Sequence, residues 1–160
     1  MKRSYSPALA LGIGAVAGLR TFAAPAVLAW AAKNEWIRLG SSPFATIISA
    51  GASKKITDLA ISELVADKLP FTPSRLKAGP LASRVVSGAV CGATVYGARQ
   101  GRLAEGAVLG ATGAIVGAFG GYYVRRRLSR RESGLKIAIL EDALAIGGGI
   151  LVAALAGRND

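Results

Sequence analysis

Long apolar runs separated by short charged segments constrain the fold of this chain more than any other feature. Hydrophobic residues make up 52% of the 160 residues, and the mean hydropathy is +0.43, whereas soluble domains are rarely this apolar. A helix of about 20 apolar residues is long enough to cross the hydrocarbon core of a bilayer. The sequence therefore predicts an all-α, polytopic membrane protein with a single transmembrane domain over residues 1–160.

Five apolar runs approach membrane-spanning length, and we expect each of them to form one transmembrane helix. The expected spans cover residues 7–32, 44–69, 84–97, 103–124 and 135–157. The first would be about 39 Å long as a helix, which is enough to cross a bilayer with some tilt. Pro25 lies within it, and because proline cannot donate a hydrogen bond to the carbonyl group of Thr21, we expect a kink there.

The second run is the least apolar, because Lys54, Lys55 and Asp58 interrupt it. Charged side chains that face lipid are costly, so this helix cannot face lipid along its whole length. We expect it to lie at the centre of the bundle or of an oligomer. The alternative is a break in the helix near residues 51–55.

Basic residues outnumber acidic ones by 20 to 9, which gives a formal net charge of +11. They gather at the ends of the apolar runs and lack the interleaved aromatic residues of a nucleic-acid-binding face, so we expect no nucleic-acid partner. With the N-terminus inside, the inner segments hold Lys68, Arg75, Lys77 and the basic cluster at 125–136. Because cytoplasmic loops are enriched in Lys and Arg, this asymmetry predicts the N-terminus inside and the C-terminus outside.

The chain has no histidine and one cysteine, Cys91. The lack of histidine removes the commonest general base and metal ligand, which argues against zinc sites and Ser-His-Asp chemistry. A single cysteine excludes an intramolecular disulfide. We therefore expect no catalytic residue, no metal and no cofactor, and we do not expect an enzyme.

Many of the 21 glycines lie inside the apolar runs, often four residues apart. This spacing is typical of closely packed membrane helices, because the missing side chains let two backbones approach. The expected packing residues are Gly14, Gly18, Gly88, Gly92, Gly110, Gly113, Gly117 and Gly121. The fourth run has the most continuous glycine face, a glycine zipper, and we expect it to mediate a homodimer or other homo-oligomer.

Two short motifs recur and suggest an inverted repeat. Residues 14–18 (GAVAG) match residues 113–117 (GAIVG), and residues 59–63 (LAISE) match residues 137–141 (IAILE). In the five-span topology the matched helices would run in opposite directions. Small transporters and channels are often built from such repeats, with the binding site where the repeats meet.

Five segments together resemble a family of small bacterial membrane proteins known only as domain of unknown function 4126. They are GLRTFAAPA (18–26), ELVADKLPFTPSR (63–75), RVVSGAVCGA (84–93), GAFGGYYVRRRL (117–128) and LEDALAIG (140–147). The resemblance covers nearly the whole chain, and the second segment is its most specific part. It implies an integral protein of the bacterial inner (cytoplasmic) membrane, but it supplies neither a substrate nor a site.

Ionisable residues inside the apolar runs carry the functional prediction. We expect Arg20, Glu63, Asp67, Glu141 and Asp142 to form a polar site for a small solute or ion, as in a small transporter or channel. The alternative is that these charges only pair with one another in a membrane scaffold or assembly protein.

A third hypothesis is a protein that handles lipid head groups. Basic residues at the membrane surface bind lipid phosphates, and membrane lipids are in any case expected partners. The candidates are Arg75, Lys77, Arg125, Arg126 and Arg127.

Overall fold

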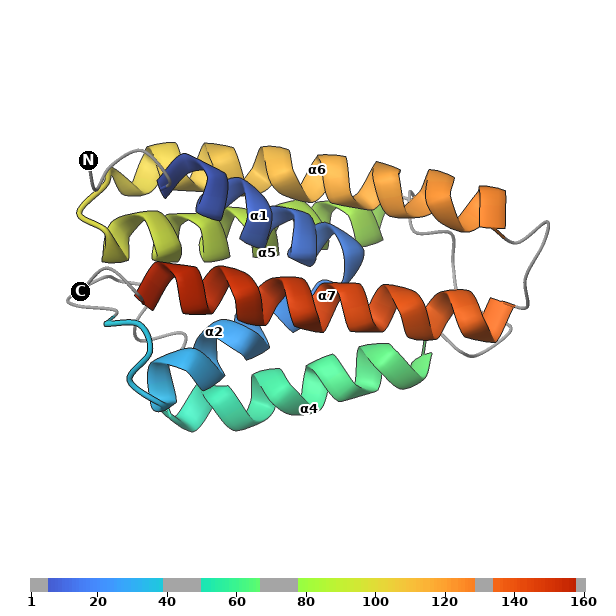
Figure 1. Cartoon of the computed structure of the whole chain (residues 1–160), viewed down its shortest axis with the longest axis horizontal. Coiled ribbons are helices and arrows are strands. Elements are labelled where there is room, and N and C mark those ends of the chain that lie inside the picture. Colours follow the sequence, from blue (N-terminus) through green and yellow to red (C-terminus); the bar gives the residue numbers. More distant parts are fainter. Residues whose placement is uncertain (1–5, 39–49, 67–77, 129–133, 158–160) are drawn as a thin grey trace.

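Helices account for most of the computed structural model, which describes residues 6–38, 50–66, 78–128 and 134–157 (Figure 1). They are α1 (Ser6–Leu19), α2 (Ala23–Lys33), α4 (Ala50–Ala66), α5 (Ala78–Ala98), α6 (Leu103–Leu128) and α7 (Gly134–Gly157). The described residues contain no strand, so the all-α prediction is confirmed. The bounds of α6 and α7 lie close to the expected spans, whereas α5 begins six residues earlier than expected.

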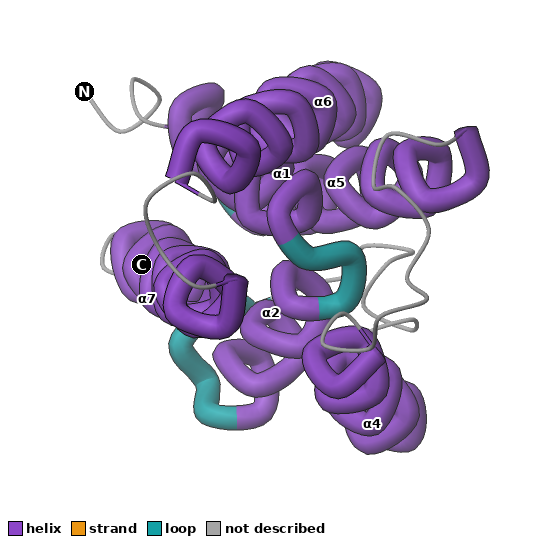
Figure 2. Tube along the Cα trace, turned by 90° about the vertical axis from the view of Figure 1, so that its right-hand side faces the viewer, coloured by secondary structure: helices purple, strands orange, loops and turns teal. Residues whose placement is uncertain are grey.

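The first apolar run does not form one helix. α1 ends at Leu19, residues 20–22 form a turn, and α2 begins at Ala23. Figures 1 and 2 show that α2 turns back, so the two helices form a hairpin. The prediction of a single span over residues 7–32 is therefore wrong.

Contacts with α7 establish that the two arms of this hairpin run in opposite directions. A β-carbon on Gly148 would lie 3.5 Å from Val16 of α1, and one on the next residue, Gly149, would lie 3.2 Å from Val27 of α2. Both arms therefore pass the same turn of α7. The chain then continues to Trp36, whose backbone packs against Gly157 at the end of α7.

Arg99 joins the start of α1 to the end of α7. Its Nε donates a hydrogen bond to Ser6 Oγ at 3.0 Å, and its Nη1 donates to the carbonyl oxygen of Ala156 at 3.2 Å. The first and last described helices thus begin and end at the same end of the bundle, here called the Arg99 end. The described part of the chain begins and ends at this same end because the first apolar run folds back as a hairpin, whereas five single spans would place these ends apart.

Three helices pack most closely where α6 meets α1 and α5. A β-carbon on Gly14 or on Gly92 would lie 2.8 Å or 2.7 Å from the Cα of Gly110, and one on Gly88 would lie 2.7 Å from the carbonyl oxygen of Gly110. Real β-carbons do not approach backbone atoms so closely, so only glycine fits at this junction. Gly110 is therefore the point at which α1, α5 and α6 touch backbone to backbone.

The remaining predicted packing glycines also make contacts within the chain. Gly18 packs on Ala114, Gly113 on Leu11, Gly117 on Ala15 and Gly121 on Leu19. Residue numbers rise together along both helices, so α1 and α6 run in the same direction. This excludes the predicted inverted relation between the motifs at 14–18 and 113–117. It also means that an interface with a second copy would need a different surface.

α4 lies at the edge of the bundle and packs mainly against α2 (Figure 2). Lys54, Lys55 and Asp58 are exposed, as are the apolar residues Leu59 and Val65. The prediction that this helix lies at the centre of the bundle is wrong for the single chain. α4 is continuous from Ala50, so the expected alternative of a break near residues 51–55 is also wrong.

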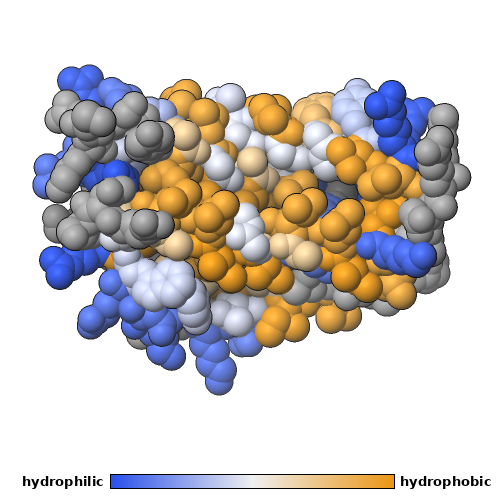
Figure 3. Space-filling view, viewed as in Figure 1, coloured by the Kyte–Doolittle hydropathy of each residue, from blue (hydrophilic) through white to orange (hydrophobic). Residues whose placement is uncertain are grey.

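Among the described helices, α6 and α7 are long and apolar enough to cross a membrane. Only 28% and 39% of their most apolar windows is buried inside the bundle, whereas the core helix of a soluble protein would be mostly buried. Figure 3 shows apolar side chains in a band across the middle of one face, with hydrophilic residues toward both ends. These features give the protein partial membrane-helix character.

Candidate functional site

The hairpin tip, residues 20–22, brings non-helical backbone groups into the interior of the bundle. Pro25 is the third residue of α2, a first-turn position that tolerates proline because the missing N–H group would have had no helical partner. The carbonyl oxygen of Thr21 accepts a hydrogen bond from Ser87 Oγ of α5 at 2.6 Å instead. Proline thus fixes where α2 begins, rather than kinking a continuous helix as expected.

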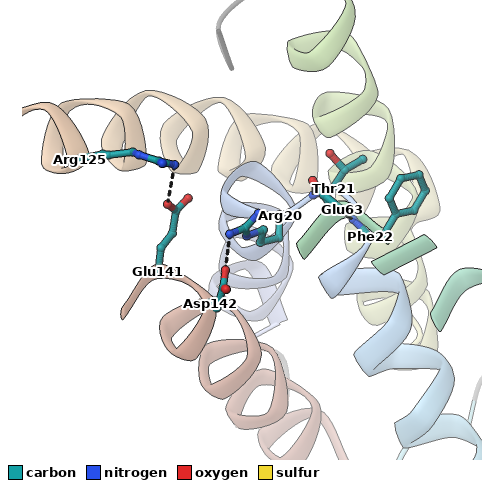
Figure 4. Close-up of polar contacts among 7 residues, drawn as sticks. All are labelled: Arg20, Thr21, Phe22, Glu63, Arg125, Glu141 and Asp142. Carbon is teal, nitrogen blue, oxygen red and sulfur yellow. Dashed lines mark hydrogen bonds and ion pairs between the residues drawn. The ribbon is translucent and has the colours of Figure 1, made fainter. Parts of the chain in front are cut away.

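Glu63 of α4 binds the N-terminal end of α2. The backbone N–H of Thr21 donates to Oε1 of Glu63 at 2.8 Å, and that of Phe22 donates to Oε2 at 2.9 Å (Figure 4). A carboxylate is favourable here because a helix N-terminus carries unsatisfied N–H groups and a partial positive charge. One side chain therefore caps a helix that lies 41 residues earlier in the chain.

Arg20 lies on the other side of the tip and is 1% exposed. It pairs with Oδ1 of Asp142 in α7 (Figure 4). It also follows the last residue of α1, where the partial negative charge of a helix C-terminus favours a cation. The tip thus links α1 and α2 to α4 through Glu63 and to α7 through Asp142.

A second ion pair lies beside the first. Nη1 of Arg125 in α6 lies 3.8 Å from Oε2 of Glu141, whose side chain is 8% exposed (Figure 4). Glu141 precedes Asp142 in α7, so adjacent acids point to different arginines. The pairs join α7 to α1 and to α6.

The polar tip lies nearer to one end of the bundle than to the other. Asp142 is six residues from Lys136, or about 9 Å along α7, and 15 residues from Gly157, or about 22 Å. The nearer end also holds Arg125 and is here called the Arg125 end. The arms of the hairpin therefore penetrate most of the way through the bundle from the Arg99 end.

Arg84 is a buried charged residue that the sequence did not single out. It is 4% exposed and lies in α5, one turn before Ser87. The third expected span began at Arg84, which placed this residue at the end of a helix. Because α5 begins at Ala78, Arg84 instead lies inside a helix, two turns from its start.

A family model for a domain of unknown function, number 4126, matches residues 8–156. The chain belongs to this family. The match covers every charged residue of the hairpin tip, and it confirms the resemblance seen in the sequence. No curated protein and no solved structure matches the chain.

In this family member, described residues of the predicted polar site make three contacts around the hairpin tip. Arg20 contacts Asp142, Glu141 contacts Arg125, and Glu63 contacts backbone N–H groups. The sequence placed Arg20, Asp142 and the two glutamates in one polar site, so it identified the charged residues but not which groups contact one another.

Several predicted residues lie elsewhere. Asp67, Arg75 and Lys77 fall outside the described residues. Arg126 and Arg127 are exposed at the Arg125 end. Within the described ranges, no group of three His, Cys, Asp or Glu side chains could hold a metal ion.

Proposed function

We propose that this chain is an integral membrane protein, in bacteria a protein of the inner membrane, with the hairpin as a re-entrant element. The outward-facing apolar helices α6 and α7 support this placement. α6 has 26 residues and is about 39 Å long, whereas α1 has 14 and reaches about 21 Å. A hydrocarbon core of about 30 Å therefore suits α6 but exceeds the length of α1.

Within the membrane, the chain acts as a small transporter or channel, and the hairpin tip is its binding site. Non-helical backbone is tolerated at membrane depth only where protein buries it or where it lines a water-filled cavity. Broken helices whose ends meet buried charges form the substrate sites of many transporters. The observation that carries this proposal is the hairpin tip, where Arg20 and the non-helical N–H groups of Thr21 and Phe22 meet acids from two other helices.

The species carried is a small anion, and Glu63 is its internal competitor. The two N–H groups that hold the Glu63 carboxylate form an anion site at a helix N-terminus. Glu63 comes from α4, which packs mainly against α2 and so can move with little loss of packing. When α4 withdraws, a solute anion takes the place of the carboxylate, while Arg20 stays paired with Asp142 in α7.

Flux through liposomes tests this function. Wild-type protein should pass small anions such as chloride, nitrate or acetate, measured with anion-selective electrodes or a quenched dye. Glu63→Gln should raise the flux at least tenfold, because a neutral amide competes less well than a carboxylate with a solute anion for the two N–H groups. Glu105→Gln, an exposed position in the first turn of α6, is the matched control. If wild-type liposomes pass no small ion, transport is excluded and the scaffold hypothesis remains.

Topology follows from the hairpin and from charge. Arg125, Arg126, Arg127 and Lys136 form the densest basic cluster, at the Arg125 end, whereas Arg38, Arg99 and Arg102 are spread over the Arg99 end. Following the positive-inside rule, we propose that the dense cluster faces the cytoplasm, which puts the start of the chain outside rather than inside as expected. Reporters fused before Ser6 and after Gly157 should then both read outside, and a reporter inserted between α6 and α7 should read inside. Opposite readings for the two terminal fusions would exclude the re-entrant hairpin.

A second copy covers α4. Asp58 is exposed and lies five residues, about 7 Å, from Glu63 along the helix, so in the bilayer it lies at the depth of the apolar band. An exposed charge there is costly unless it is paired. In a two-fold dimer, Lys54 of each copy can reach Asp58 of the other.

Charge reversal tests this dimer. Asp58→Lys should shift the protein toward monomer in sedimentation experiments, and Lys54→Asp added to it should restore the dimer. An interface at α4 would be excluded if the wild-type protein sediments as a monomer. It would also be excluded if neither substitution changes the sedimentation of the dimer.

A further inference from the structure

A groove of about 270 Å³ lies between α6 and α7, away from the hairpin tip's backbone groups. Ala15 and Leu19 of α1 form its floor. Its walls are Gly117, Gly120, Gly121, Val124 and Leu128 of α6 and Ile137, Leu140 and Leu144 of α7. Two lining residues are charged, Arg125 and Glu141. We propose that this groove binds one acyl chain of an anionic phospholipid, whose phosphate lies against the arginines that end α6.

The groove exists because α6 presents glycine where a side chain would fill the space. α6 and α7 make few direct contacts, and Gly120 has open space where its side chain would be, with no atom within 4 Å of an added β-carbon. Large apolar side chains such as Leu140 and Leu144 line the opposite wall and are exposed. The result is an apolar channel that is open along the outside of the bundle.

The charge at one end of the groove selects the head group. Arg125 lies in the groove, and Arg126 and Arg127 follow it in the last turn of α6. Tyr123, Val124, Arg126 and Arg127 line an adjoining pocket of about 520 Å³. Guanidinium groups bind phosphate through paired hydrogen bonds, and a basic pocket beside membrane helices is a site for anionic lipid.

Glu141 keeps Arg125 at the groove. The pair is 3.8 Å apart, longer than a direct hydrogen bond, and Arg125 remains partly exposed. Arg125 can therefore bind a lipid phosphate without leaving Glu141. Since Glu141 neutralises only one charge, Arg126 and Arg127 favour an anionic head group over a zwitterionic one.

The size of the groove favours an acyl chain over a protein helix. A helix with its side chains is about 10 Å wide, so most of its volume would lie outside a groove of about 270 Å³. An extended acyl chain is narrow and wholly apolar, so it fits a channel walled by glycine, valine and leucine. The proposal rests on the membrane placement proposed above, but it does not require transport.

Native mass spectrometry of the detergent-purified protein tests the site. The probes are a phosphatidylglycerol and a phosphatidylcholine with the same acyl chains. We expect one phosphatidylglycerol to be retained at a concentration at least tenfold lower than phosphatidylcholine. Equal retention of the two lipids would overturn the proposed role of the arginines.

Paired variants separate the groove from general lipid binding. Gly120→Leu fills the groove without a clash, whereas Gly147→Leu adds the same side chain at another open position, on α7 and outside the groove. Gly120→Leu should lower phosphatidylglycerol retention at least tenfold, and Gly147→Leu should leave it unchanged. An equal effect of the two variants would overturn the groove as the site.

Arg125→Gln tests the role of arginine in head-group selection. Its control is Arg102→Gln, an exposed position at the Arg99 end. Arg125→Gln should reduce the preference for phosphatidylglycerol at least threefold, and Arg102→Gln should not. An unchanged preference in Arg125→Gln would contradict the assignment. Lipid retention and anion flux are measured separately. A failure of the lipid proposal can therefore be told apart from a failure of the transport proposal.

Discussion

The two halves of the bundle are held together in different ways. α1, α5 and α6 meet backbone to backbone at glycines, with Gly110 at the centre. α4 and α7 are joined to the hairpin through charged groups, Glu63 on backbone N–H groups and Asp142 on Arg20. Backbone contacts have no side chain that can adjust, whereas a carboxylate can exchange one partner for another. We therefore expect α1, α5 and α6 to form a rigid half, and α4 and α7 to form a half that can rearrange.

A single substitution in the rigid half should prevent the protein from folding. Gly110→Leu places a side chain where three glycines of α1 and α5 touch α6. Overpacking typically costs about 1–3 kcal/mol where neighbours can adjust, and we expect a larger cost here because backbones must separate. The variant should give no monodisperse peak in size-exclusion chromatography. Gly147→Leu, at an open position, is the control, and wild-type behaviour of Gly110→Leu would contradict the comparison.

The ion pair at the tip should give the next largest effect. Asp142→Asn leaves Arg20 buried without its charged partner in α7, and breaking such a pair costs about 3–5 kcal/mol. Arg20→Met added to it should restore part of the stability, measured by thermal unfolding in detergent.

A double-mutant cycle sharpens this prediction. Arg20 and Asp142 should couple more strongly than Arg20 and Glu63, because Glu63 binds backbone groups instead. Equal coupling of both acids to Arg20 would mean that the three groups form one shared site, as the sequence suggested.

Removal of the cap on α2 should have a smaller and local effect. Glu63→Gln keeps one acceptor oxygen for two N–H groups, and the loss of a helix cap costs about 0.5–2 kcal/mol. Hydrogen exchange should speed up at Thr21, Phe22 and α4 while α6 stays protected. Uniform loss of protection across all helices would show that the two halves are not distinct.

The pair at the Arg125 end should matter least for stability. Arg125 is 32% exposed, and partly exposed ion pairs are worth about 1 kcal/mol or less. Arg125→Gln should therefore lower the melting temperature by only a few degrees. If Arg125→Gln lowers the melting temperature as much as Asp142→Asn does, the Arg125 pair is as important for stability as the buried pair at the tip.

Much of the architecture could be predicted from the sequence because it depends on local pattern. The apolar run at 135–157 predicts α7 almost residue for residue, despite the charges of Lys136, Glu141 and Asp142 within it. The glycine spacing marked Gly14, Gly88 and Gly110 as close-packing positions, although not which helices they join.

The hairpin could not be predicted in this way. A largely apolar run of 26 residues predicts one span whether it crosses or turns back, and Pro25 suggested a kink rather than a helix start. Which acid pairs with Arg20 depends on how α7 lies against α1, a tertiary relation with no local signal. Glu63 was identified as a charge in an apolar helix, but its partners are backbone groups that exist only because the hairpin turns.

The pairing of Arg20 with Asp142 has a consequence for biosynthesis. The two residues are 122 positions apart, so at about 5–20 residues per second the ribosome needs roughly 6–24 s to make the acid after the arginine. Glu63 emerges after a third of that interval. The nascent chain must therefore hold its first hairpin with a capped tip, and without the ion pair between Arg20 and Asp142, until α7 is made. Completion of the last helix, rather than entry of the first, is then the step that commits the hairpin to its place.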